Sequence, residues 1–216
     1  KVLDWYSKSS FFNHDNFTRM LRFAVDESFK ERAVDILDYG GGGGQFALIC
    51  KSHFPESRVF ITDVCDDTLL EPWKPMNTQI PFCDFERDER KFDVIFLNDV
   101  FEHVSDPVQL LIRLAGKLKN DGRIFIDTPK QFWLYPFTRI ISRTLHGKLL
   151  KATVSRYHLQ IWTRTSFRMA AHKSGLRVRK YQERSEYTMP SHFYLRNMGI
   201  QNPILRALGW IFYQNA

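Results

Sequence analysis

Several features are missing from this 216-residue sequence, and each absence removes a class of protein. No apolar run reaches the ~18 residues that a membrane-spanning helix needs, and no secretory leader is visible, so we expect a cytoplasmic protein. Low-complexity segments are also missing. With 44% hydrophobic and 25% charged residues, the chain has the composition of one globular domain that buries a substantial core.

Cysteine is scarce and its spacing is uninformative. Cys50, Cys65 and Cys83 form no CxxC pair and no metal-binding pattern. An odd, scattered set of this kind predicts reduced thiols, and it argues against a disulfide framework or a structural zinc site.

The most informative stretch is a run of five glycines between two structured segments. An apolar, β-favouring run over 34–39 leads into Gly40–Gly44, and a helix-compatible stretch follows over 45–53. A flexible linker is the alternative, but a linker would have polar flanks. Strand, glycine turn and helix together predict a turn that brings backbone N–H groups close to a ligand.

The spacing of these glycines indicates which ligand. A dinucleotide site requires G-x-G-x-x-G, and the third glycine of that pattern falls on Gln45 or Phe46, which disfavours an NAD(P) oxidoreductase. A G-x-G-x-G pattern does fit, with an acid two residues upstream. Those residues are Asp38, Gly40, Gly42 and Gly44. They resemble the first motif of class I S-adenosylmethionine-dependent methyltransferases.

Two further strands are predicted to end in acids. Residues 58–63 form a strand ending at Asp63, nineteen residues beyond Gly44, close to the interval at which an acid meets a ribose in such folds. A carboxylate can accept hydrogen bonds from both ribose hydroxyls. A third, short strand over 79–84 ends at Asp84, and the resemblance implies that Asp84 binds the adenine amino group.

Residues 91–107 carry the second specific stretch. A buried strand over 92–97 is followed by Asn98-Asp-Val-Phe-Glu-His-Val-Ser-Asp-Pro107. This resembles the Leu-Glu-His-Val-x-Asp-Pro signature of the ubiquinone-type small-molecule methyltransferases, with Phe101 where Leu is usual. Asp106 and Pro107 then predict a helix start, and the apolar spacing extends that helix through Leu118 towards Asp121.

A fifth strand is predicted over 122–128, so strands and helices alternate through residues 34–130. This pattern and the resemblance together predict an α/β fold, a Rossmann-like doubly wound sheet of about seven strands with helices on both faces. We expect one domain: an N-terminal helical segment over 1–33, with its helix at 13–30, the cofactor-binding core over 34–130, a basic helical cap inserted over 131–160, and the rest of the sheet with a tail helix over 161–216.

The resemblance implies an enzyme that transfers a methyl group from S-adenosylmethionine to a small-molecule acceptor, most often at oxygen. A non-catalytic relative that binds the cofactor or a partner is the alternative. Displacement at a sulfonium methyl needs alignment and, for the acceptor's proton, a base or a metal. His103 and His158 are the candidate bases. The implied cofactor-binding residues are Asp38, Gly40, Gly42, Gly44, Asp63, Asp84 and Asn98. Asp99, Glu102 and His103 match an acid-x-x-Glu-His set that, in the ubiquinone enzymes, binds a divalent metal such as Mg²⁺.

The region after the core is basic. Between Arg139 and Arg184 there are twelve Lys or Arg residues and one acid, Glu183, within a net charge of +7. No recognised RNA-binding module accompanies them, so nucleic acid is not the expected partner. A solvated face is one reading. Aromatic residues among the charges over 131–150 favour contact with the inner face of a membrane, which suits a lipid-like or lipid-linked acceptor.

Overall fold

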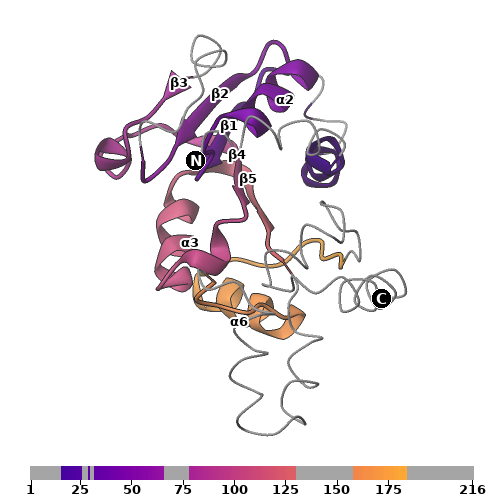
Figure 1. The fold of residues 1–216 in the computed structure, drawn as a ribbon, viewed down its shortest axis with the longest axis vertical. Coiled ribbons are helices and arrows are strands. Elements are labelled where there is room, and N and C mark those ends of the chain that lie inside the picture. Colours follow the sequence, from indigo (N-terminus) through magenta and orange to yellow (C-terminus); the bar gives the residue numbers. More distant parts are fainter. Residues whose placement is uncertain (1–15, 26–28, 30–31, 66–77, 130–157, 184–216) are drawn as a thin grey trace, which may run out of the picture.

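A computed structural model describes residues 16–25, 29, 32–65, 78–129 and 158–183 (Figure 1). Strands and helices alternate along these ranges. Residues 16–24 are helical. The elements that follow are β1 (Asp35–Tyr39), α2 (Gln45–His53), β2 (Arg58–Thr62), β3 (Thr78–Gln79), the 3₁₀ turn η4 (Phe82–Asp84), β4 (Phe92–Asn98), the 3₁₀ turn η5 (Phe101–His103), α3 (Pro107–Gly116), β5 (Leu118–Asp127) and α6 (Arg164–Lys173).

The five strands form one parallel sheet in the order β3-β2-β1-β4-β5. The chain runs outwards from β1 to β3 and then returns to pair β4 with the other side of β1. Ligands of such sheets bind beyond the carboxyl ends of the strands, where the direction of winding reverses. The predicted doubly wound α/β fold is therefore confirmed. The prediction of about seven strands stays untested, because 184–216 lie outside the described ranges and 176–183 form no strand.

Alternate residues of the central strands build two separate cores. On one face, side chains of β1 and β4 pack against the helix at 16–24 and α2; on the other face they pack against α3 and α6. The first set is Ile36, Val94 and Phe96, and the second is Leu37, Ile95 and Leu97. All six are completely buried, and each contributes about 1.5–3 kcal/mol by leaving water. The central strands are thus fixed from both sides.

Helix α3 begins as the sequence predicts and ends earlier. The Asp106 Oδ1 accepts a hydrogen bond from the Gln109 N–H at 3.0 Å, with Pro107 as the first helical residue. The helix stops at Gly116, and Leu118 already belongs to β5, whereas the apolar spacing placed it in the helix. The Phe92 N–H donates to the carbonyl of Lys117 at 2.8 Å, so pairing with β4 overrides the local helical pattern.

The strand predicted over 79–84 is present only as the two-residue β3 (Thr78–Gln79), so its predicted bounds are wrong. Strand β3 ends at Gln79, and Pro81 begins the 3₁₀ turn η4 instead, with the Asp84 N–H donating to the Pro81 carbonyl at 2.9 Å. Proline offers no N–H to a neighbouring strand, which explains why the ladder stops.

Several expectations lie outside the described ranges. These are most of the cap over 131–160 and the tail helix expected within 161–216. Within the ranges described, no helix is long and apolar enough to cross a membrane.

Candidate functional site

The candidate residues lie where the parallel strands end. Asp38 is the last residue but one of β1, Asp63 follows β2, Asn98 ends β4, and Glu102 lies on η5, shortly after β4. Because the strands are parallel, these positions share one edge of the sheet. The structure thus brings together polar and acidic side chains that are spread over sixty-five residues of the sequence.

The glycine turn has the conformation that its composition favours. Gly40, Gly42 and Gly44 have φ angles of 76°, 49° and 82°, in the left-handed region that costs other residues about 1–2 kcal/mol. A Cβ at Gly40 would overlap the side chain of Val100, and one at Gly41 would lie 2.7 Å from the Asp38 Oδ2. The turn therefore packs directly on the ends of β1 and β4, with no room for side chains at these two points.

Asp63 holds this turn against the end of β2. Its Oδ2 accepts from the Gly42 N–H at 2.9 Å, and its Oδ1 accepts from the Cys65 N–H at 3.0 Å. The Gly40 N–H also donates to the Thr62 carbonyl at 2.7 Å. Asp63 is half-buried. Each carboxylate oxygen has a second lone pair, so the geometry leaves Asp63 able to accept from a ligand as well.

Asp38 lies beneath the turn rather than facing solvent. Its residue is 2% exposed, its carboxylate accepts from the backbone N–H of Ala47 in α2, and its Oδ2 has no hydrogen-bond partner among the described residues. Burial, together with the negative charge of Asp63, raises the pKa of Asp38 to about 7. Asp38 thus lies between the glycine turn and α2 and contacts both.

Asn98 ends β4 beside the point where the sheet changes direction. Both the Oδ1 and the Nδ2 of its side chain are buried and have no hydrogen-bond partner in the described part of the chain. Leaving buried polar atoms unpaired costs about 1–3 kcal/mol. Native proteins tolerate this mainly at sites that a ligand or water completes. Asp84, by contrast, is exposed on η4.

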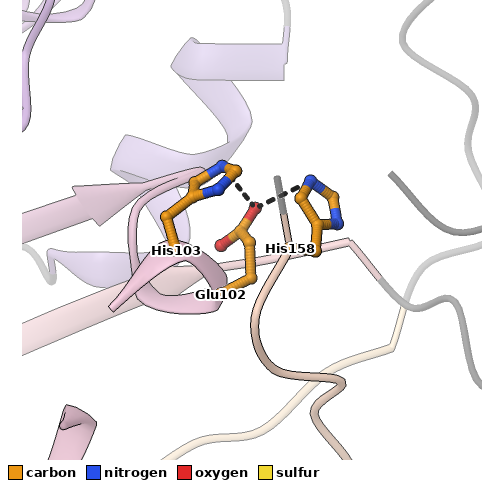
Figure 2. Close-up of side chains that lie close together, drawn as sticks. All are labelled: Glu102, His103 and His158. Carbon is orange, nitrogen blue, oxygen red and sulfur yellow. Dashed lines mark ion pairs between the residues drawn. The ribbon is translucent and has the colours of Figure 1, made fainter. Parts of the chain in front are cut away.

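Glu102 forms the centre of a second group beyond β4, shown in Figure 2. Its residue is 1% exposed. The Oε2 accepts from the Thr128 hydroxyl at 2.9 Å, while the Oε1 lies 3.9 Å from the Nε2 of His103 and 4.0 Å from the Nε2 of His158. The Oε1 has no hydrogen-bond partner among the described residues. A buried carboxylate therefore faces two imidazoles at distances too long for direct bonds.

His158 reaches this group because the segment that carries it binds the backbone of Glu102. The N–H groups of Leu159 and Gln160 donate to the Glu102 carbonyl at 2.8 and 3.1 Å. The ring of Phe101 stacks on Trp162 with centroids 4.4 Å apart. Phe101, which stands where the resembling signature has leucine, thus supplies an aromatic surface that holds the returning chain.

Charge is concentrated around Glu102. Burial raises the pKa of Glu102. Asp99 is exposed as a whole residue, but burial of its carboxyl group, together with the nearby carboxylates of Glu102 and Asp127, raises its pKa to about 7. Burial and the neighbouring His103 lower the pKa of His158 to about 4. His158 is therefore neutral at neutral pH, and Asp99, Glu102 and Asp127 make this edge of the sheet acidic.

Two residues of this group were not predicted as site residues from the sequence. Thr128 orients Glu102, and Asp127, which ends β5 opposite Asn98, acts on the carboxyl groups of Asp99 and Glu102. Only their position at the end of a strand could have indicated them. Asp99 itself, with φ 52°, is not part of the compact trio of Glu102, His103 and His158, whose ligand atoms lie within 4.8 Å of one another.

Comparison with known proteins places this geometry in context. A family model described as a methyltransferase domain matches residues 12–181. The ubiquinone biosynthesis O-methyltransferase of Coxiella burnetii is 24% identical over 140 residues, which cover 60% of this chain and 58% of that protein. The malonyl-[acyl-carrier protein] O-methyltransferase 1 of Ilyobacter polytropus is 26% identical over 127 residues, covering 53% and 47%. The chain thus spans less than two thirds of the length of these curated relatives.

Solved structures share the fold. The phosphoethanolamine N-methyltransferase 2 of Haemonchus contortus, in complex with S-adenosyl-L-methionine, matches with a TM-score of 0.56 and 20% identity over 74% of this chain and 36% of that one. The plantazolicin methyltransferase BpumL, in complex with a pentazolic desmethylPZN analog and SAH, matches with a TM-score of 0.54 and 19% identity over 78% of this chain and 65% of that one. At these identities the likeness concerns the fold alone.

Proposed function

Because the chain belongs to the methyltransferase domain family, we propose that it transfers a methyl group from S-adenosylmethionine to the oxygen of a small-molecule acceptor. The observation that carries this proposal is that the Oδ1 and Nδ2 of Asn98 have no hydrogen-bond partner among the described residues. They lie at the carboxyl end of β4, next to β1, whose glycine turn is fixed by Asp63. These features fit a ligand that needs close backbone approach and additional hydrogen bonds.

Each candidate residue then has a role in binding the cofactor. Gly40, Gly42 and Gly44 allow its methionine part to approach the backbone. Asp63 accepts hydrogen bonds from the ribose hydroxyls with the lone pairs that the turn leaves available. Asn98 hydrogen-bonds the ligand at the end of β4, and Asp84 on η4 binds the adenine amino group. Asp38 acts through the turn, because its carboxylate lies beneath Gly41.

When bound, S-adenosylmethionine supplies an electrophilic methyl group on a positively charged sulfur. The carboxylates of Asp99, Glu102 and Asp127 favour a cation at this edge of the sheet. His103 is the candidate general base, because its side chain is 39% exposed and can reach an acceptor, while Glu102 at 3.9 Å stabilises the resulting imidazolium. His158, 13% exposed, is the second candidate and also confines the acceptor.

Surface charge and the names of two relatives support the acceptor class that we propose. Two relatives are named for O-methylation, one of them in ubiquinone biosynthesis. In this chain the described residues after the insertion carry exposed cations, including Arg164, Arg168 and Arg177. Cations of this kind favour an anionic surface. We therefore propose a lipid-like or lipid-linked acceptor, methylated while the protein contacts the face of a membrane.

Calorimetric titration with S-adenosylhomocysteine tests the cofactor assignment. We expect binding below ~100 μM and a loss of at least tenfold, about 1.4 kcal/mol, in Asp63→Ala. Glu56→Ala is the matched control, since Glu56 is an exposed acid near the opposite end of β2. Absence of binding to the wild-type chain at ~100 μM would sink the proposal. Unchanged affinity in Asp63→Ala would refute the ribose role alone.

A methyl-transfer assay with a quinol-like phenol as acceptor tests the base. General-base catalysis contributes about 10²–10⁴ in rate, so His103→Ala should lower kcat by about a hundredfold and leave the affinity for S-adenosylhomocysteine unchanged. An equal loss of affinity would show that His103 supports the cofactor site instead.

A further inference from the structure

We propose that Trp162 is a positioning residue for methyl transfer, because its indole ring packs on Phe101 and thereby fixes His158 beside His103. Trp162 lies four residues after His158 on the segment that follows the insertion. Phe101 stands where the signature that this stretch resembles has leucine, so the contact between the two rings is particular to this chain. The packing stands on the structure alone, whereas its importance for the reaction rests on the proposed function.

Three aromatic rings from three parts of the chain form one stack, which consists of Phe101, Trp162 and Phe167. Phe101 is completely buried and Trp162 is 8% exposed. The centroids of these two rings lie 4.4 Å apart with an interplanar angle of 27°. The ring of Phe167 in α6 lies 5.7 Å from that of Phe101 and 4.9 Å from that of Trp162. Aromatic pairs at such distances contribute more than their buried area alone, so the stack joins η5, the segment after the insertion and α6.

Both histidines of the site are carried by residues next to this stack. Phe101 begins the 3₁₀ turn that ends at His103, and Trp162 follows His158 closely on its own segment. Figure 2 shows the two imidazoles on either side of Glu102, and their ring centroids lie 4.8 Å apart, edge to face. A shift of Trp162 relative to Phe101 would therefore change the separation of the two imidazoles.

Hydrogen bonds fix the segment on both sides of Trp162. Before it, the N–H groups of Leu159 and Gln160 donate to the Glu102 carbonyl at 2.8 and 3.1 Å. After it, the side chain of Thr163 caps the start of α6. The indole ring lies between these two anchors, so its contact with the stack sets how the segment lies against η5.

The ring of Trp162, and not its N–H group, makes this contact. The indole Nε1 is buried and has no hydrogen-bond partner in the part of the chain that the structure describes. An unpaired buried donor is unfavourable, so the N–H group weakens the packing that the ring supports. Phenylalanine keeps an aromatic surface and has no polar atom. We therefore expect it to replace tryptophan at this position.

Fixed imidazoles matter because displacement at a methyl group depends on alignment. A misplacement of about 1 Å can lower the rate about a hundredfold, even when the substituted residue lies away from the reacting atoms. His103 is the candidate base and His158 confines the acceptor. Loosening the stack would therefore move the acceptor relative to the base, and kcat should respond more than the affinity for the cofactor.

Steady-state kinetics of two substitutions at Trp162 test the proposal. Trp162→Leu should lower kcat by about tenfold to a hundredfold, and its affinity for S-adenosylhomocysteine, measured by calorimetry, should change by no more than about twofold. Trp162→Phe keeps an aromatic ring and should retain kcat within about threefold. Phe92→Leu is the matched control. It removes a ring that is 1% exposed and lies 5.6 Å from Phe60, at the amino end of β4, so it should reduce stability and leave kcat unchanged.

The pKa of His158, followed by proton NMR of its imidazole, gives a readout that does not need turnover. Burial and the neighbouring His103 hold this pKa at about 4. Glu102 is the nearest carboxylate, and it interacts in turn with Asp99 and Asp127. In the leucine variant the imidazole should move away from His103 and become more exposed, so its pKa should rise towards ~6.5. The phenylalanine variant and the matched control should keep the value of the wild type.

The opposite pattern would overturn the proposal. If Trp162→Leu loses stability as Phe92→Leu does but keeps both kcat and the pKa of His158, Trp162 is a core residue and no more. A phenylalanine variant as impaired as the leucine variant would assign the effect to the indole N–H and contradict the role of the ring. Thermal unfolding shows whether each variant is folded. Phe101→Leu, which introduces the residue of the resembling signature, tests the same contact if leucine at position 162 prevents folding.

Failure of the proposed function would give a different result. A wild-type chain without methyl transfer, in which Trp162→Leu still raises the pKa of His158, would count against the reaction and leave the placement of His158 by the stack standing. Normal methyl transfer in Trp162→Leu would leave the reaction standing and count against the positioning role.

Discussion

The two ends of the parallel sheet differ in whether their buried acidic and polar side chains have partners in the described part of the protein. At the amino ends, Asp35 in β1 and Asp93 in β4 are both buried and both paired. Lys119 of β5 bridges them with its Nζ 2.7 Å from an oxygen of each, Arg58 binds both oxygens of Asp35 at 2.6 and 2.8 Å, and Arg32 lies 2.8 Å from Asp93. The Asp35 N–H also donates to Asp93 at 2.8 Å.

At the carboxyl ends, buried polar atoms lack such partners. The Oδ2 of Asp38, both side-chain atoms of Asn98 and the Oε1 of Glu102 have no hydrogen-bond partner within the described ranges. The pKa values follow the same division. Although burial alone would raise them, the neighbouring cations lower the pKa of Asp35 and Asp93, whereas burial raises the pKa of Asp38 and Glu102. We expect the paired carboxylates at the amino ends to stabilise the fold, and we propose that a ligand supplies the missing partners at the carboxyl ends.

Among these substitutions, the largest loss of stability at fixed pH should come from breaking the charge pairs at the amino ends. Asp93→Ala removes the acceptor of the Asp35 N–H and the partner of Lys119 and Arg32. Loss of one partner of a buried pair costs about 3–5 kcal/mol, and the partly exposed cations reduce this to about 2–3 kcal/mol. Urea unfolding measures it. Affinity for S-adenosylhomocysteine should not change, and a parallel loss of affinity would contradict the division of roles.

An exposed pair supplies the control for that measurement. Arg113 and Glu86 lie 2.9 Å apart, with side chains 46% and 53% exposed. Glu86→Ala should lower the free energy of unfolding by less than about 0.5 kcal/mol. A comparable loss in the two variants would mean that burial of Asp93 contributes nothing.

The pH dependence of stability should also differ between the two ends. The folded-state pKa of Asp38 is about 7, above the value of ~3.9 in an unfolded chain. The folded state therefore binds more protons between these values, and the free energy of unfolding falls as pH rises from about 4 to 7, by at most ~1.4 kcal/mol per pH unit. Asp38→Asn should remove this contribution to the slope.

For the paired carboxylates of Asp35 and Asp93, the free energy of unfolding changes with pH in the opposite direction. Since the pKa of Asp35 and Asp93 is lowered in the folded state, their stabilisation is complete above ~3.9 and is lost as pH falls below it. Urea unfolding of the wild type and Asp38→Asn at several pH values checks both statements. A slope that is the same in the two proteins would show that Asp38 ionises freely.

The smallest effect is expected at Asn98. Asn98→Ala removes two buried polar atoms that have no partner in the described chain, so the unliganded protein should be unchanged or up to about 1 kcal/mol more stable. Affinity for S-adenosylhomocysteine should fall about tenfold, equivalent to ~1.4 kcal/mol. Unfolding and calorimetry on the same variant measure both. Reduced stability with unchanged affinity would place Asn98 among the structural residues.

Local sequence predicts one part of this molecule well. Strand β1, the glycine turn and α2 were all predicted from 34–53, because short-range spacing and glycine conformation determine them. Helix α3 starts where Asp106 and Pro107 predict but ends before Leu118, since pairing with β4 is a long-range effect. The strand expected over 79–84 is reduced to Thr78–Gln79, because Pro81 has no N–H to continue the pairing with β2.

The candidate site shows the same limit. Asp63 was predicted from its distance to the glycines, and the structure places it against Gly42. The grouping of His158 with Glu102 could not be predicted, because fifty-five residues separate them and no local pattern records the contact. Sequence adjacency favoured Asp99 as the neighbour of Glu102 and His103, whereas the fold brings in His158.

The attachment of His158 has a consequence for how specificity can change. The chain leaves the core at Thr128, which binds the side chain of Glu102, and returns at Leu159 and Gln160, which bind its backbone. Both ends of the segment between them are therefore anchored to one residue. We therefore expect that residues 130–157 can be exchanged without loss of these contacts to Glu102, and we propose that such an exchange changes the acceptor.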